Sequence, residues 1–584
     1  MSKYLLIILV WIALYAVPLF LHPMHKPDEA RYAEIAREMA ASNDWLIMKI
    51  NGMPYPEKPP MFTWLTAAGF KLFGPKIWVG RMVSALSMLL LSLALFATTK
   101  KLIGSAAALI SSIVALSQLA SAGIGQLCII DPIFAFFIGL TVLFSVRVIL
   151  GKSKKYYWFF GIAASLSLAG AMLSKGPAGL ILAGGIVSLW AIITGNFKKL
   201  LLFIINPIFW IVTFIFIYIY YHFAEKQLPG ISNYFFIHEN ILRYFTKVHK
   251  RGQPLWFFIP VFLGGALPWT IVMPFVIHFY YKYKAAWLKD KVWLWLAIIW
   301  MILPVAFFSL SDSKLPTYIL LSFFGVGLFV GLWLHRISTD EYKNEYNKIT
   351  KFIRVLYTIL CYGLAVAALI FGVIFMLNIQ LAKHLAPEPS ISIWCMIAAF
   401  ISIILATLIY LYNWKSLTKL LIISNIIIIV ATGLIIRVTN LQAGQLKLIA
   451  KLKKMVKPNV IVVQYSVLDS AIPFTLQRNI SSALVSGDMR YTTVKSRLNT
   501  KLTDMFDYYF RGNPNNISPT NWPCPKNVWY DQKDFLKLFT SDKPVLVYTK
   551  TRYLAWLKNI KVYSLANDQK YSIIANEAYF KKYK

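Results

Sequence analysis

Charged residues are scarce in this sequence, and acidic residues are the scarcer kind. Asp, Glu, Lys and Arg make up 14% of the 584 residues, hydrophobic residues make up 58%, and 24 acidic residues stand against 60 basic ones. A soluble globular domain carries about 25% charged residues. The composition therefore excludes an ordinary soluble protein and indicates an integral membrane protein.

Cysteine is also too sparse to build a disulfide framework. Cys128, Cys361 and Cys395 fall in or beside apolar runs, and Cys524 stands alone near the end of the chain. The sequence has no glycine-rich nucleotide-binding loop, no internal repeat and no low-complexity tract. The first apolar run carries no small-residue cleavage site, so we expect a retained helix and not a removed signal peptide.

Long apolar runs recur thirteen times along the chain. Each has about 20 residues, which is enough to cross a hydrocarbon core of about 30 Å as a helix. The pattern predicts an α-helical polytopic membrane protein. We expect the spans near residues 4–22, 80–99, 102–121, 130–150, 157–173, 177–194, 198–221, 255–281, 291–309, 315–335, 352–378, 391–413 and 416–437.

The loops between these runs alternate in charge. Basic loops favour the cytoplasm, and every second loop is rich in Lys and Arg, starting with Lys100 and Lys101. The remaining loops then face outward, and all of the unusual polar motifs fall in them. One membrane face is therefore expected to carry the function. The expected outer segments are 23–79, 122–129, 174–176, 222–254, 310–314, 379–390 and everything after about 438.

The chain divides into two predicted domains. Residues 1–440 form a transmembrane domain with juxtamembrane helices at about 23–79 and an outer loop at 222–254. Residues 441–584 contain the strand-like runs VIVVQ and VLVY with helical stretches between them, which predicts a small soluble α/β domain. Long domains translocate largely regardless of their charge, so helix parity places this one outside.

Two acids begin predicted helices on the outer face. Asp28 opens an amphipathic stretch that suits a helix lying on the membrane surface. It either complements the helix dipole or serves as a general base or electrostatic partner for a reacting group, and Arg31 one turn later either pairs with it or binds substrate. Asp131 begins a span, where acids are rare and usually functional, although it could cap that helix beside Pro132.

Two outer turns carry lysines in constrained backbone. The prolines of PYPEKPP (54–60) fix an extended loop from which Glu57 and Lys58 project; the alternative is a solvated charge pair. Lys175 in LSKGPAG occupies a tight turn between two spans. It either contacts a phosphate or snorkels to the interface.

The outer loop 222–254 adds His238 and Arg243 in a predicted short helix. These residues belong either to a functional site or to a hydrated loop with a basic edge near anionic lipid headgroups. Glu57 and His238 could supply two ligands for a divalent cation, which are too few to establish a metal site. Tyr318 in SDSKLPTYIL begins another span and could equally be an interfacial aromatic.

The mixture of charges indicates a class of chemistry. The cations Lys58, Lys175 and Arg243 could serve an anion transporter, but Asp28 and Asp131 would oppose the passage of an anion. Binding a phosphate while orienting a nucleophile or a sugar uses both signs of charge.

The motifs together resemble those of the bacterial lipid A aminoarabinose transferase family, relatives of the protein O-mannosyltransferases within the C-type glycosyltransferase fold. The resemblance is strongest over residues 1–320, and the motifs occur in family order. They are DEARYAEIAREM (28–39), PEKPP (56–60) followed by Trp64 and Leu65, Asp131, SKGP (174–177), HENILRYF (238–245), QPLWFF with LPWT (253–270) and SKLPTY (313–318).

The resemblance implies a sugar donor carried on undecaprenyl phosphate and a transfer on the periplasmic face of the bacterial inner membrane, with the C-terminal domain periplasmic. Asp28 would be the catalytic carboxylate, and Asp131 would line the same cavity. Glu57 and His238 sit where some relatives hold a metal ion, so a Zn-like divalent ion is implied there, while no cofactor is expected to be required. The residues implied to contact donor or acceptor phosphates are Lys58, Lys175, Arg243 and Tyr318.

The resemblance also implies an inverting displacement, in which an acceptor oxygen such as a lipid A phosphate oxygen attacks the anomeric carbon. Pro56, Ile130 and Pro132 differ from the usual neighbours of the site residues, so the sugar stays open among aminoarabinose, galactosamine, mannose and others. A protein O-glycosyltransferase and a lipid transporter remain as alternatives. The net charge of +36 indicates contact with anionic membrane lipids and not with nucleic acid, and we expect a monomer.

Overall fold

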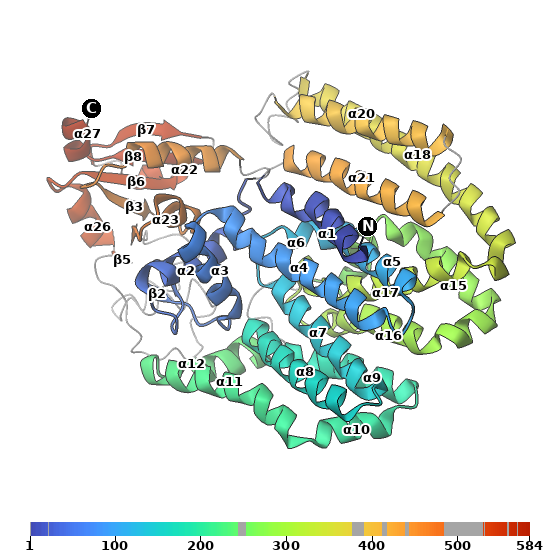
Figure 1. The fold of residues 1–584 in the computed structure, drawn as a ribbon. Coiled ribbons are helices and arrows are strands. Elements are labelled where there is room, and N and C mark those ends of the chain that lie inside the picture. Colours follow the sequence, from blue (N-terminus) through green and yellow to red (C-terminus); the bar gives the residue numbers. More distant parts are fainter. Residues whose placement is uncertain are drawn as a thin grey trace. The chain divides into compact units, whose positions relative to one another are not determined.

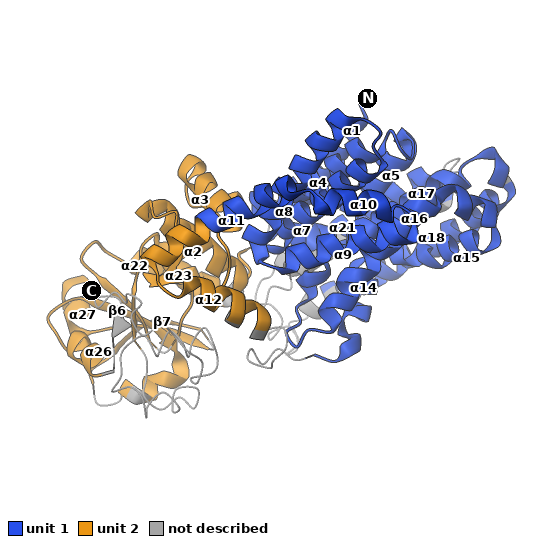
Figure 2. Cartoon of the chain, turned by 90° about the horizontal axis from the view of Figure 1, so that it is seen from below, with its two compact units in different colours: residues 1–22, 81–219, 251–440 blue, residues 23–80, 220–250, 441–584 orange. Residues whose placement is uncertain are grey.

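The computed structural model divides the chain into two compact units (Figure 2). Unit 1 comprises Met1–His22, Arg81–Ile219 and Arg251–Asn440, and unit 2 comprises Pro23–Gly80, Tyr220–Lys250 and Leu441–Lys584. The structure describes residues 2–20, 23–242, 253–376, 390–411, 417–438, 443–465, 467–483, 529–530, 532–557, 560–568 and 570–583.

Apolar helices dominate the described residues, and eight of them are long and apolar enough to cross a membrane. Their length and composition follow from the runs in the sequence, so the predicted helical membrane fold class is confirmed. They are the N-terminal helix Lys3–Phe20 (α1 with its continuation), α4 (Ile77–Thr99), α7 (Asp131–Leu150), α8 (Lys154–Lys175), α11 (Pro207–Gln227), α16 (Lys284–Ser309), Pro316–Ile337 (which contains α17, Ser322–Ile337) and Asn344–Ile370 within α18 (Lys343–Met376).

Two predicted spans are bent pairs instead of straight helices. α5 (Ser105–Leu116) and α6 (Leu119–Gly125) meet at 62°, and Leu255–Gly265 meets Trp269–Lys282 at 95°. The remaining predicted spans correspond to α9 (Ala178–Ile193), α20 (Ser390–Leu411) and α21 (Leu417–Val438). Every predicted run therefore contains helix among the described residues.

The predicted span 198–221 is wrong in its boundaries. A short helix α10 (Phe197–Ile205) ends before α11 begins at Pro207. Pro207 has no N–H to continue a helix, and Asn206 is extended, with its side-chain oxygen accepting the N–H of Ile208 at 3.1 Å. The break separates two helices, whereas the continuous apolar run in the sequence predicts a single helix.

Close helix packing in unit 1 depends on glycine. A Cβ on Gly331 of α17 would lie 2.6 Å from the backbone N and Cα of Ser111 in α5. Only a residue without a side chain permits this approach, so the Gly325, Gly327 and Gly331 series brings α17 against its neighbours.

Unit 2 begins with the juxtamembrane helices. α2 (Asp28–Ser42) ends at Asn43, which has a left-handed φ of 57°. The short hairpin of β1 (Lys49–Ile50) and β2 (Met53–Pro54) follows, then α3 (Met61–Phe73). Tyr32 packs edge-on against Phe62 at 5.8 Å between ring centroids, which joins α2 to α3.

The C-terminal part of unit 2 is an α/β subdomain with a six-stranded sheet (Figure 1). The strand order is β5-β4-β3-β6-β8-β7, where β5 to β6 run parallel and β8 is antiparallel to both β6 and β7. The predicted strands are confirmed as β3 (Ile461–Tyr465) and β6 (Val545–Lys550) at the centre. The other elements are β4 (Ser481–Ala483), β5 (Trp529–Tyr530), β7 (Tyr563–Asn567), β8 (Tyr571–Ala575), α22 (Ala443–Met455), α23 (Ala471–Leu476), α26 (Gln532–Phe539) and α27 (Glu577–Tyr583).

The core of this subdomain lies between the sheet and α26. Val463, Tyr465 and Val547 are fully buried with Phe535, and the rings of Tyr465 and Phe535 stack at 4.5 Å. β3 and β6 are buried along nearly their whole length, as central strands covered on both faces are.

Candidate functional site

Asp28 is the first residue of α2, and its carboxylate is held from within the same helix. Arg31 donates from Nη2 to Asp28 Oδ1 at 2.5 Å, while the Asp28 side chain remains 41% exposed. The N-cap position belongs to Pro27, and no side chain caps this helix end. Asp28 is therefore oriented by a cation and still accessible, which suits a reacting carboxylate better than a helix cap.

Arg31 has hydrogen-bonding capacity that the described residues do not use. Its Nε is buried without an acceptor among them, and its guanidinium lies 5.3 Å from the Tyr32 ring centroid and 6.0 Å from that of Tyr55. A buried charged donor without an acceptor is costly. The guanidinium therefore keeps a donor that can bond to an acceptor from outside the described residues.

Glu57 and Lys58 each bond to the side chain of another residue, and Lys58 Nζ also donates to the carbonyl of Glu57 at 2.9 Å. Tyr55 donates to Glu57 Oε2 at 3.0 Å, and Lys58 Nζ lies 3.4 Å from Glu239 Oε2. Tyr234 donates to Glu239 Oε1 at 3.2 Å. The proline-rich loop is thereby tied to the helix of π type at Tyr234–Leu242.

The described residues offer few ligands for a metal ion. Among them, no group of three or more His, Cys, Asp and Glu side chains is placed to hold one. The Glu57 carboxylate already accepts from Tyr55, and the side chain of His238 lies outside the described residues. Of the two expected ligands, only the side chain of Glu57 is described, and one carboxylate alone does not make a metal site.

Unit 1 brings together three residues that the sequence predicts. Asp131 begins α7, Lys175 ends α8, and Lys175 Nζ lies 2.6 Å from Asp131 Oδ1. The same ammonium group sits 3.9 Å above the ring centroid of Tyr318. Cation–π attraction and the ion pair fix the ammonium from two sides.

Lys175 and Asp131 form a mostly buried ion pair, and the start of α7 has no side-chain cap hydrogen bond. Their side chains are 13% and 14% exposed, and Phe134 and Phe308 lie 5.4 and 5.7 Å from the ammonium. An ammonium has three N–H donors, so the bond to Asp131 leaves donors for a phosphate oxygen.

The structure thus places eight of the nine predicted residues and describes the side chains of seven. Asp28 and Arg31 form one pair, Asp131, Lys175 and Tyr318 form another cluster, and Arg243 lies outside the described residues. The sequence analysis did not predict that Tyr55 bonds to Glu57 or that Glu239 bonds to Lys58. Tyr55 stands inside PYPEKPP and Glu239 inside HENILRYF, so the motifs contained the signal, but the pairing of Lys58 with Glu239 needed the fold.

Comparison with solved structures identifies the architecture. ArnT from Cupriavidus metallidurans superposes with a TM-score of 0.78 in its complex with undecaprenyl phosphate and 0.76 in the apo state. Each comparison covers 98% of both chains at 22% identity. The chain has the C-type glycosyltransferase fold. The fold class expected from the resemblance is therefore confirmed.

Comparison with known sequences confirms the resemblance. The family model for dolichyl-phosphate-mannose-protein mannosyltransferase matches residues 1–223. The chain is 29% identical over 322 residues to the undecaprenyl phosphate-alpha-4-amino-4-deoxy-L-arabinose arabinosyl transferase of Erwinia tasmaniensis, and 29% identical over 365 residues to transferase 1 of Proteus mirabilis. These matches cover 55% and 60% of this chain and span 57% and 63% of the relatives' own lengths.

Proposed function

We propose that the protein is an inverting glycosyltransferase that moves an aminoarabinose-like sugar from undecaprenyl phosphate to a lipid A phosphate. It would act at the periplasmic face of the bacterial inner membrane, with the C-terminal subdomain in the periplasm. The observation that carries the proposal is the pair of Asp28 and Arg31: a half-exposed carboxylate oriented by a guanidinium whose Nε is buried without an acceptor among the described residues.

Asp28 and Arg31 together can bind both the anionic phosphate and the sugar of the donor. The Arg31 guanidinium can donate to a phosphate oxygen, because planar N–H groups match a phosphate well. The Asp28 carboxylate can accept a hydrogen bond from a sugar hydroxyl or attract its amino group. The two side chains therefore suit a substrate that carries a sugar next to a phosphate.

Within unit 1, Lys175 is also suited to contact a phosphate, as an ammonium and not as a planar guanidinium. Its ammonium is fixed by Asp131 and the ring of Tyr318, so it reaches a ligand with little loss of side-chain freedom. Positive charge held in place before the reaction stabilises a developing phosphate anion more strongly than a mobile charge does.

The chemistry is a single displacement. An oxygen of the acceptor phosphate forms a bond to the anomeric carbon as the bond from that carbon to the undecaprenyl phosphate oxygen breaks, and the leaving phosphate keeps the electron pair. The configuration at the anomeric carbon inverts. Because the acceptor oxygen is already anionic, no proton must be removed, and Asp28 would orient the sugar; with a hydroxyl acceptor it would take the proton.

The similarities support the donor class. The relatives from Erwinia and Proteus carry undecaprenyl phosphate and aminoarabinose in their names, and the solved ArnT structure with the same fold binds undecaprenyl phosphate. A lipid-linked donor also fits a chain whose described residues contain eight apolar helices of spanning length. Membrane lipids are the expected surroundings, and a monomer is the expected unit.

Mass spectrometry of lipid A tests the function. The host is a bacterium that makes the aminoarabinose donor but lacks its own transferase, and it expresses the protein or its Asp28→Asn variant at matched levels. We expect lipid A to gain one aminoarabinose mass per modified phosphate with the protein and none with the variant. Unmodified lipid A with both proteins would reject lipid A as the acceptor, and sugar found on serine or threonine of periplasmic proteins would point to protein glycosylation.

A further inference from the structure

We propose that the C-terminal α/β subdomain positions helix α2, and that Asp469 and Asn479 are the positioning residues through which it sets the orientation of Asp28. The inference rests on the proposed function, since it assigns the subdomain a part in the transfer reaction. All of the contacts that carry it lie within unit 2.

The first contact fixes the start of α2. Lys26, two residues before Asp28, forms an ion pair with Asp469 at 2.5 Å, and the two side chains are 7% and 9% exposed. A buried ion pair holds its partners firmly, because losing one partner leaves the other charge buried without compensation. The chain entering α2 is therefore tied to the subdomain.

Asp469 is itself held by the sheet and by a helix. Its backbone N–H donates to Gln464 Oε1 on β3 at 2.9 Å, and Gln445 of α22 donates to Asp469 Oδ2 at 2.9 Å. Its other carboxylate oxygen accepts the N–H of Ala471 at 3.0 Å. Lys26 thus meets a preorganised carboxylate just beyond the carboxyl end of a central strand.

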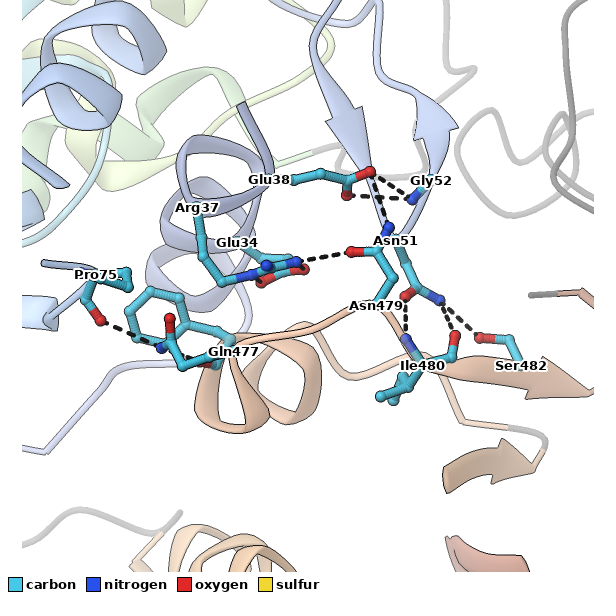
Figure 3. Close-up of polar contacts among 11 residues, drawn as sticks. Glu34, Arg37, Glu38, Asn51, Gly52, Pro75, Gln477, Asn479, Ile480 and Ser482 are labelled. Carbon is cyan, nitrogen blue, oxygen red and sulfur yellow. Dashed lines mark hydrogen bonds and ion pairs between the residues drawn. The ribbon is translucent and has the colours of Figure 1, made fainter. Parts of the chain in front are cut away.

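The second contact fixes α2 about three turns further along (Figure 3). Arg37 donates to Asn479 Oδ1 at 2.7 Å, and Asn479 donates to Glu38 Oε1 at 3.1 Å. Arg37 is aligned by two bonds of 2.7 Å to the buried Glu34 carboxylate. One asparagine side chain therefore joins two successive residues of the helix.

The same segment of the subdomain also holds the hairpin before Glu57 and Lys58. Asn51 donates to the carbonyl of Ile480 at 2.8 Å and accepts its N–H at 2.9 Å, as a neighbouring strand would. Asn51 also donates to Ser482 Oγ at 3.2 Å. Gly52 N–H donates to Glu38 at 2.9 Å, which closes the network (Figure 3).

A helix anchored near both ends moves little, so these contacts determine where Asp28 and Arg31 point. Misplacement of a reacting group by about 1 Å can cost about 100-fold in rate. Among the described residues, Asp28 bonds to Arg31 of its own helix, so the effect of the subdomain should appear in the rate of the chemical step more than in donor binding.

The test compares two carboxylate-to-amide variants in the full-length purified protein. Asp469→Asn removes the carboxylate that pairs with Lys26. Glu577→Gln removes a carboxylate at the start of α27 in the same subdomain, which forms exposed ion pairs with Lys561 and Lys581. Steady-state transfer is measured with the undecaprenyl-phosphate-linked sugar. We expect kcat to fall at least ten-fold in Asp469→Asn with KM for the donor changed less than three-fold, and both constants to stay near the wild type in Glu577→Gln.

A charge exchange adds a readout that a purely structural role would not move. Lys26→Asp and Asp469→Lys should each lower kcat, and the double variant should recover at least a third of the lost activity. Asn479→Ala provides a second route if Asp469→Asn does not fold. Wild-type kcat in folded Asp469→Asn and Asn479→Ala would overturn the proposal.

Hydrogen exchange separates this inference from the proposed function. Amides of the first two turns of α2 should exchange at least ten-fold faster in Asp469→Asn, while those of β6 keep their protection. If the wild type transfers no sugar, the proposed function fails, yet exchange still decides whether the subdomain anchors α2. Unchanged exchange in α2 would overturn the anchoring.

Discussion

At the scale of single residues, the proposed reaction depends on Asp28 and Arg31, a carboxylate and a cation that are paired but still accessible. Asp28 accepts from Arg31 at 2.5 Å, and the Asp28 side chain is twice as exposed as that of Arg31, at 41% against 21%. The Arg31 guanidinium contacts the Asp28 carboxylate and lies near the rings of Tyr32 and Tyr55. The Asp28 carboxylate is open to a ligand. Removing either charge should therefore affect chemistry more than folding.

Asp28→Asn should lower kcat about 100-fold, because Asp28 orients the sugar and misplacement of a reacting group by about 1 Å can cost that much in rate. The Asp28 side chain is 41% exposed and, in the part of the chain that the structure describes, bonds to Arg31 of the same helix, so the thermal midpoint should change little. The Glu577→Gln variant controls for loss of a carboxylate. Turnover within three-fold of the wild type in Asp28→Asn would remove Asp28 from the reaction.

The ring of Tyr318 should matter more than its hydroxyl. Lys175 Nζ lies 3.9 Å from the ring centroid, so Tyr318→Phe keeps the cation–π contact and Tyr318→Leu loses it. We expect undecaprenyl phosphate to bind within three-fold of the wild type in the Phe variant and about ten-fold more weakly in the Leu variant. Equal affinities in the two variants, measured by calorimetry in detergent, would contradict this role for the ring.

The residue types of the site were predictable from the sequence, but their pairings were not. Asp28, Asp131 and Lys175 stand out because charge at the end of an apolar run is rare. The bond between Lys175 and Asp131 joins residues 44 apart in the chain. Such a pairing depends on how α7 packs against α8, which a single sequence does not encode locally.

At the scale of elements, glycine decides how closely the helices approach. Gly331→Leu places a side chain where a Cβ would already meet the Ser111 backbone at 2.6 Å. Overpacking of this kind costs about 1 to 3 kcal/mol, so the thermal midpoint in detergent should fall clearly.

Gly363→Ala is the matched control, because a Cβ at that helical position of α18 meets nothing within 4 Å. Alanine favours a helix over glycine, so this variant should be neutral or slightly more stable. A loss of stability in Gly363→Ala as large as that in Gly331→Leu would contradict the packing argument.

The turn after α2 should depend on pH through Asp44. Burial raises the pKa of Asp44. Hydrogen bonds from Lys49 and from the backbone N–H groups of Ile47 and Leu46 together lower this pKa by more than burial raises it, so the pKa lies below its ordinary value of 3.8. The stabilisation is therefore present above about pH 4 and is lost as pH falls through the lower folded pKa.

Thermal unfolding at pH 6 and at pH 3 checks this sign. Asp44→Asn should lower the midpoint at pH 6 and have a smaller effect at pH 3, which lies below the ordinary pKa of 3.8, so that part of the stabilisation is already lost. A difference between the two proteins that grows on acidification would contradict the assignment.

Bends within spans show where apolar pattern is an incomplete guide to elements. The break between α5 and α6 is held by distant groups: Gln118 donates to the carbonyl of Phe323 at 2.7 Å, and Trp269 donates to that of Ser117 at 2.7 Å. The runs themselves stay apolar through the bend. The number of runs was therefore predictable from hydrophobicity, whereas their angles depend on partners far along the chain.

At the scale of the whole molecule, the apolar content and the alternation of loop charge were enough to predict a helical membrane protein with an α/β tail. They were not enough to show that residues 23–80 form one compact unit with that tail. The contacts responsible, such as Lys26 with Asp469 and Asn51 with Ile480, join residues more than 400 positions apart. The proposed function assigns this unit the pair of Asp28 and Arg31, in which Asp28 orients the sugar and Arg31 binds a phosphate oxygen.

The most direct test of the central claim is transfer by the purified protein in liposomes that contain undecaprenyl-phosphate-linked aminoarabinose and lipid A. We expect lipid A carrying the sugar and free undecaprenyl phosphate to appear in equal amounts, with inverted configuration at the anomeric carbon and with no transfer by Asp28→Asn. Consumption of the donor without modified lipid A, or equal transfer by the wild type and Asp28→Asn, would contradict the account.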